Sequence, residues 1–100
     1  MDIYPGSIVV ATAGRDKEKF FVVLSLEDNF AYISDGYTRK VDVPKKKKFK
    51  HLKDTGKTSL LIRSKLESGQ MITNSMIKKE IQTVILATFF KEIMLLLKVI

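Results

Sequence analysis

The chain is 100 residues long, which is the size of one small domain with room for a short appendage. Its hydrophobic fraction of 45% suffices for a packed core and excludes a disordered chain, and its formal net charge of +7 favours nucleic acid or an anionic membrane surface over acidic small substrates. The absence of cysteine and the single histidine, His51, exclude disulfides, thiolate metal sites and histidine-rich metal centres.

The first half of the chain alternates short β-branched or aromatic runs with turn residues, which predicts five strands. The expected strands are Ser7–Thr12, Lys19–Glu27, Phe30–Ser34, Arg39–Val43 and Lys48–Lys53. The turns between them carry Gly14, Asp28-Asn29, Asp35-Gly36 and Pro44. The second strand is apolar nearly throughout, so we expect it to be covered on both sides or strongly bent. In the last two strands we expect Val41, Val43, Phe49 and Leu52 to face the core. Five short strands with tight turns predict a small, strongly curved β-barrel.

After Lys53 the sequence pattern becomes typical of helices. Asp54–Lys57 is expected to be a linker, and Ser59–Ser68 a short helix that ends at Gly69. Thr73-Asn74-Ser75 offers an N-cap for a second helix, which we expect to continue through the apolar segment Val84–Ile100 and to pack on the barrel or on another copy. That segment is interrupted by charges and is shorter than the roughly 20 apolar residues of a membrane span. The predicted fold class is therefore α+β, with a barrel over residues 1–54 and a helical extension over residues 55–100.

The densest charge of the chain lies between Arg39 and Lys53, where eight basic residues face one acid, Asp42. The eight are Arg39, Lys40, Lys45, Lys46, Lys47, Lys48, Lys50 and Lys53. Such a run is too dense to be neutralised locally, so it faces water or a polyanion. Lysine binds phosphate as a point charge without one required geometry, which suits contacts to a nucleic-acid backbone. Phe30, Tyr32 and Tyr37 lie near this run and are candidates for stacking on an unpaired base; the alternative for each is core packing, which we favour for Phe30.

The sequence gives little support for a catalytic role. The carboxylates form no recognisable pair, the serines lack a nucleophile-elbow context, and the position of His51 in the basic run favours a surface role over that of a general base. Gly56-Lys57-Thr58 matches the end of a phosphate-binding loop, but the earlier glycine of that motif would fall at His51. We expect no enzyme activity, no cofactor, no metal and no small-molecule substrate. The start MDIYPGS lacks a basic region followed by an apolar run, which predicts no signal peptide and a cytoplasmic protein.

The stretch SIVVATAGRDKEKFFVVLSLEDNFAYISDG followed by YTRKVDVPKKKKFKHL resembles the bacterial KOW-domain RNA-binding proteins, which are similar to certain large-subunit ribosomal proteins. The KOW pattern is a hydrophobic strand, a glycine-centred basic loop and a second hydrophobic strand, matched here by Gly6–Thr12, Ala13–Lys19 and Phe20–Leu26. The resemblance implies an SH3-like barrel that binds RNA, often ribosomal RNA, without catalysis and in association with the ribosome. The candidate RNA surface then comprises Gly14, Arg15, Lys17, Arg39, Lys40, Lys45, Lys46, Lys47, Lys48, Lys50, His51 and Lys53.

Two other functions fit the same features. A protein-interaction module would use the lysines for an acidic partner and Val84–Ile100 for docking or self-association. Peripheral attachment to an anionic membrane would use the lysines together with the apolar segment.

Overall fold

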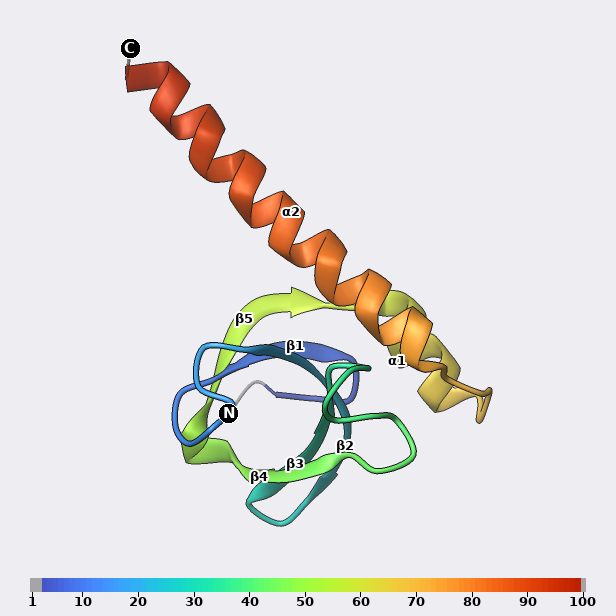
Figure 1. Ribbon diagram of the computed structural model, residues 1–100. Coiled ribbons are helices and arrows are strands. Elements are labelled where there is room, and N and C mark those ends of the chain that lie inside the picture. The colour runs from blue at the N-terminus through green and yellow to red at the C-terminus, as the bar shows by residue number, and fades with distance from the viewer. Residues whose placement is uncertain (1–2, 100) are drawn as a thin grey trace.

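The computed structural model describes residues 3–99 as a curved antiparallel sheet followed by two helices. The strands are β1 (Ser7–Ala11), β2 (Phe20–Glu27), β3 (Phe30–Ser34), β4 (Lys45–Lys48) and β5 (Leu52–Thr58). A 3-10 turn, η1 (Phe49–His51), separates β4 from β5, and the helices are α1 (Leu60–Glu67) and α2 (Asn74–Val99). The strand order is β4-β3-β2-β1-β5, and the sheet curls so strongly that it wraps around its own core (Figure 1). The predicted α+β class, a small curved β-domain followed by helices, is confirmed.

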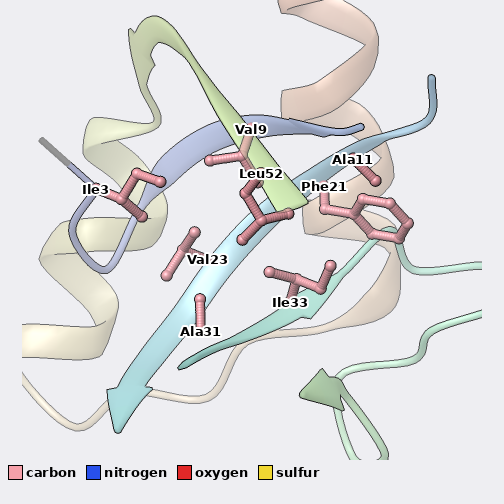
Figure 2. Packing of buried hydrophobic residues seen from close by; sticks show 8 residues of the cluster. All are labelled: Ile3, Val9, Ala11, Phe21, Val23, Ala31, Ile33 and Leu52. Atoms are coloured by element: carbon pink, nitrogen blue, oxygen red, sulfur yellow. The ribbon is translucent and has the colours of Figure 1, made fainter. Parts of the chain in front are cut away.

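The sheet buries side chains on both of its faces. Eight residues form the core inside the curve: Ile3, Val9, Ala11, Phe21, Val23, Ala31, Ile33 and Leu52 (Figure 2). On the outer face, Ile8 and Val22 pack with Ile62 of α1 and with Ile77 and Ile81 of α2. Because side chains alternate along a strand, β2 must be apolar at nearly every position to serve both clusters. Of the two predicted alternatives, coverage on both sides or strong bending, coverage holds for residues 20–24, whereas residues 25–27 are exposed.

The predicted strand Arg39–Val43 is wrong, because this segment consists of bends and a turn. Asp35 accepts hydrogen bonds from the backbone N–H groups of Tyr37 and Arg39 at 2.8 and 2.9 Å. The N–H of Val41 donates to Oδ1 of Asn74, at the start of α2, at 2.8 Å. Side chains therefore occupy backbone groups that a ladder would need. As a result Val43, expected in the core, is 73% exposed, whereas Val41 packs against the outer cluster.

The lysine run itself is the fourth strand, and the predicted strand Lys48–Lys53 is instead the end of β4, η1 and the start of β5. Leu52 is buried and Phe49 packs partly buried against the inner core, as predicted. The predicted linker Asp54–Lys57 lies within β5. In the pairing with β1, Val9 faces Asp54 and Ile8 faces Lys57, so Thr55 and Gly56 form a bulge. Gly56 has a φ of +79°, and the Thr55 hydroxyl donates to the Ile8 carbonyl at 2.7 Å. The turn-like sequence is thus a bulge inside a strand, and the sheet extends past residue 54 to Thr58.

Each helix begins after a hydroxyl cap; the cap of α2 lies in the predicted Thr73-Asn74-Ser75, whereas Ser59, predicted as the first residue of its helix, is the cap of α1. The Ser59 hydroxyl accepts a hydrogen bond from the N–H of Ile62 at 3.1 Å, and the Thr73 hydroxyl accepts one from the N–H of Met76 at 3.2 Å. Helix α2 continues through the apolar segment, as predicted, but only its first half packs on the sheet and the rest extends away from it (Figure 1). Among the described residues, no helix combines the length and the apolar character needed to cross a membrane.

Candidate nucleic-acid interface

The glycine-centred loop and the lysine strand lie next to each other in the fold. Nζ of Lys47 donates to the carbonyl of Ala13 at 2.8 Å, and the N–H of Thr12 donates to the carbonyl of His51 at 2.8 Å. Gly14 has a φ of +79°, which agrees with its predicted role in turning the loop. We call the surface formed by loop 12–19, β4 and η1 the basic edge. The structure thus brings together two groups of predicted residues that are far apart in the sequence.

Strand β4 is an edge strand whose lysines alternate in exposure. It pairs with β3 from Lys45 opposite Ile33 to Lys48 opposite Phe30. Lys46 and Lys48 are exposed, whereas Lys45 and Lys47 are half-buried. The four lysines therefore do not form one uniform charged surface, and Lys47 serves to hold the loop.

Lys46 is engaged by its neighbours on β2 and β3. Its Nζ lies 3.3 Å from Oε1 of Glu27 and 4.6 Å from the centroid of the Phe30 ring. The Tyr32 hydroxyl donates to Oε2 of the same Glu27 at 2.8 Å. The hydrogen bond from Tyr32, followed by that from Lys46, lowers the pKa of Glu27, and the hydrogen bonds to Glu27 raise the pKa of Tyr32 and of Lys46. At neutral pH the carboxylate therefore offsets the charge of Lys46, and Tyr32 is held in place by a hydrogen bond.

Arg39 has a structural partner. Its Nη2 lies 3.0 Å from Oδ2 of Asp16, whose side chain is only 5% exposed, and Lys19 lies 4.0 Å from the other oxygen. Asp16 belongs to the glycine-centred loop, so this pair fixes that loop against the segment that follows β3. Arg39 is thus a residue that positions the basic edge rather than a cation available to a ligand.

The remaining predicted cations have no acidic partner within residues 3–99. Six of them are exposed: Arg15, Lys17, Lys40, Lys48, Lys50 and Lys53. Lys45 and His51 are half-buried. A hollow of about 820 Å³ lies where β4 meets η1, and it is lined by Asn29, Phe30, Lys48, Phe49 and Lys50. Two exposed lysines therefore flank two half-buried aromatic rings, an arrangement that suits phosphate contact beside a stacking surface.

A second basic feature was missed by the sequence analysis. A groove of about 620 Å³ runs between the start of α2 and the segment after β3, and its cationic lining comes from Lys19, Lys78 and Lys79. Tyr37, which is 68% exposed, also lines it, and Nζ of Lys78 lies 4.4 Å from the centroid of its ring. The Lys78-Lys79 pair lies outside the dense basic run. Its proximity to Tyr37 depends on how α2 docks, for which the sequence carries no local signal.

Residues 3–99 contain no group of three or more histidine, aspartate or glutamate side chains placed to hold a metal ion. A comparison with protein-family models finds no family that matches the chain, and a comparison with curated proteins finds no similar sequence.

Proposed function

We propose that the chain is a non-enzymatic, cytoplasmic RNA-binding module that contacts RNA, with ribosomal RNA as the first candidate, through the basic edge. The observation that carries the proposal is the hollow at the β4–η1 junction, where Lys48 and Lys50 flank Phe30 and Phe49. The exposed Arg15 lies in the loop that Lys47 holds against β4. Cations beside aromatic rings are what a flexible, unpaired RNA segment requires.

The salt dependence of binding follows from the number of free cations. Each phosphate contact with a single strand lowers the slope of log K against log salt by about 0.7. If most of the six exposed cations contact phosphates, the slope is roughly −3 to −4. Lys46 and Arg39 are expected to add little, because each already has a carboxylate partner.

The same lysines have two other possible roles that the experiment must separate. An acidic protein partner would use the same charges but would gain nothing from the aromatic hollow. Lysines on an edge strand also prevent edge-to-edge pairing of sheets, which requires no ligand at all.

The deciding experiment measures binding of the purified protein to a single-stranded ribosomal RNA fragment, to duplex DNA of equal length and to polyglutamate, each across a salt series. The variant K48Q/K50Q removes the two cations of the hollow, and K91Q/K98Q removes two exposed cations on distant turns of α2. We expect K48Q/K50Q to weaken RNA binding about tenfold and to flatten its salt slope by about 1.4, and K91Q/K98Q to change neither appreciably.

If the two variants lost RNA affinity equally, binding would be a general attraction between a basic protein and a polyanion, and the proposal would be contradicted. Binding to polyglutamate that is as tight as binding to RNA, with the same dependence on Lys48 and Lys50, would favour the acidic protein partner instead.

A further inference from the structure

The side of α2 that packs on the sheet becomes charged where the helix leaves the sheet. Residues at seven-residue spacing lie close to one line along a helix. On this line Ile77 is fully buried in the outer cluster and Val84 packs partly buried against it, whereas Lys91 and Lys98 are exposed. Beyond Val84 the helix therefore no longer carries an apolar face suited to packing on its own sheet.

The opposite side of α2 changes from polar to apolar along the helix. In the first half this side carries Lys79 and Gln82, and seven residues later the same positions are Leu86 and Phe89. The apolar positions continue at alternating spacings of three and four. We call the resulting stripe the seam, and it comprises Leu86, Phe89, Phe90, Ile93, Leu96 and Leu97. Phe89 is 57% exposed and Leu96 is 65% exposed, so the seam is uncovered in the single chain.

We propose that the seam pairs with the seam of a second copy of this chain, with the two helices antiparallel. The spacing of three and four residues is the one by which two helices interlock their side chains. The seam carries no charge, so two copies meet without like-charge contact. If each of the six side chains buries about 90 Å², the pair buries roughly 1,000 Å² in total, which reaches the lower bound for a specific interface.

The other side of the same segment argues against a helix that lies on a membrane. Such helices carry a strongly charged polar face. Here the side opposite the seam has Lys91 and Lys98, but Leu95 is also exposed there, at 55%, and Met94, which borders the seam beside Phe90, is 57% exposed. A helix pair leaves these side chains at its periphery, where scattered apolar residues are common.

The net charge decides the orientation. Each copy carries +7, so a parallel pair would place two basic barrels at the same end of the seam. In an antiparallel pair with Leu86 against Leu96 of the second copy, residue 84, where each helix leaves its sheet, lies opposite residue 98. The two points of departure are therefore about 21 Å apart along the pair, which exceeds the Debye length of about 8 Å at physiological salt. An antiparallel pair therefore separates the barrels beyond the range of strong repulsion. It places Leu86 against Leu96 of the second copy, and Phe89 against Ile93 of the second copy.

The first test is the mass of the full chain in solution as a function of concentration, by sedimentation equilibrium. We expect the mass to rise from that of the monomer to twice that value in the micromolar range. Phe89→Asp should keep the chain monomeric, and Leu95→Asp, on the same helix but outside the seam, should leave the dimer intact. A wild-type chain that stays monomeric throughout, or equal effects of the two substitutions, would overturn the proposal. So would a monomer that binds phosphatidylserine vesicles in a manner that Phe89→Asp abolishes.

The second test determines the orientation of the two helices. Because the chain has no native cysteine, any disulfide must join the introduced residues. Under mild oxidation, an equimolar mixture of Leu86→Cys and Leu96→Cys chains should form a disulfide-linked pair, and each variant alone should not. A parallel pair would give the reverse, with efficient cross-linking of each variant alone, and would overturn the proposed orientation.

Discussion

The two halves of α2 are both rich in apolar residues, but their surroundings differ. In the first half Ile77 and Ile81 are buried against the outer face of the sheet. In the second half Phe90 and Leu97 are 62% and 61% exposed, because that part of the helix extends beyond the sheet. Both halves are helical and apolar, so the position of the apolar face around the helix, and not the apolar content, decides what each half packs against.

The most direct test of this difference between the two halves of α2 is to truncate one side chain in each half and compare the loss of stability. Ile77 is fully buried, so Ile77→Ala should lower the free energy of unfolding by about 3 kcal/mol through lost burial and a new cavity. Leu95 is 55% exposed, so Leu95→Ala should change it by less than about 0.5 kcal/mol. Urea unfolding monitored by tyrosine fluorescence measures both. If Ile77→Ala fails to fold, Ile77→Val should cost about 1 kcal/mol. Similar effects at positions 77 and 95 would show that the first half of α2 is not docked as described.

Gly36 tests how closely the start of α2 approaches the segment after β3. Its φ is +78°, and an added Cβ would lie 2.5 Å from the carbonyl oxygen of Asn74. Gly36→Ala should therefore lower the free energy of unfolding by about 2 kcal/mol, through both the backbone conformation and the clash with α2. Gly56 is the matched control, because it has a φ of +79° but open space around the added Cβ. Gly56→Ala should cost only the conformational part, about 1 kcal/mol. Equal costs would mean that the segment and α2 are not in close contact.

Local signals account for the parts of the fold that the sequence predicted well. The strand Phe30–Ser34, the cap at Thr73 and the burial of the first part of β2 on both faces all follow from residue types within a few positions. The errors lie where long-range contacts compete with local preference. Asn74, which is 33 residues away, accepts a hydrogen bond from Val41 and helps to hold Arg39–Val43 out of the sheet. Pairing with β1 likewise turns Asp54–Lys57 into a bulged strand.

The candidate site was predictable in position but not in detail. Charge density located the lysine run, whereas the glycine-centred loop was assigned to the candidate surface only through the resemblance to KOW domains. Charge density gave no information on which cations are already engaged, because Asp16 lies 23 residues from Arg39 and Glu27 lies 19 residues from Lys46. Such pairs depend on which strands pair and in which register, and neither was predicted from the sequence.

The smallest predicted effect concerns Asp35, which shapes the segment that α2 docks against. Burial alone would raise the pKa of its carboxyl group, but hydrogen bonds from the backbone of Arg39 and Tyr37 and from the Thr38 hydroxyl outweigh burial and lower it. A lowered folded-state pKa contributes stability that is present above the unfolded-state value of about 3.9 and is lost as the pH falls through the folded-state value. Asp35→Asn should therefore lower the free energy of unfolding at pH 7 by up to about 1 kcal/mol, after allowance for solvent screening.

The difference between wild type and Asp35→Asn should narrow as the pH falls below about 4, because Asp35 of the unfolded wild-type chain then binds a proton and that of the folded chain does so only at lower pH. Urea unfolding at pH 7 and at pH 3 measures this change. Asp42→Asn is the control, since Asp42 is an exposed aspartate in the same segment. A difference at Asp35 that stays constant with pH, or an equal effect at Asp42, would show that these hydrogen bonds do not depend on the charge of Asp35.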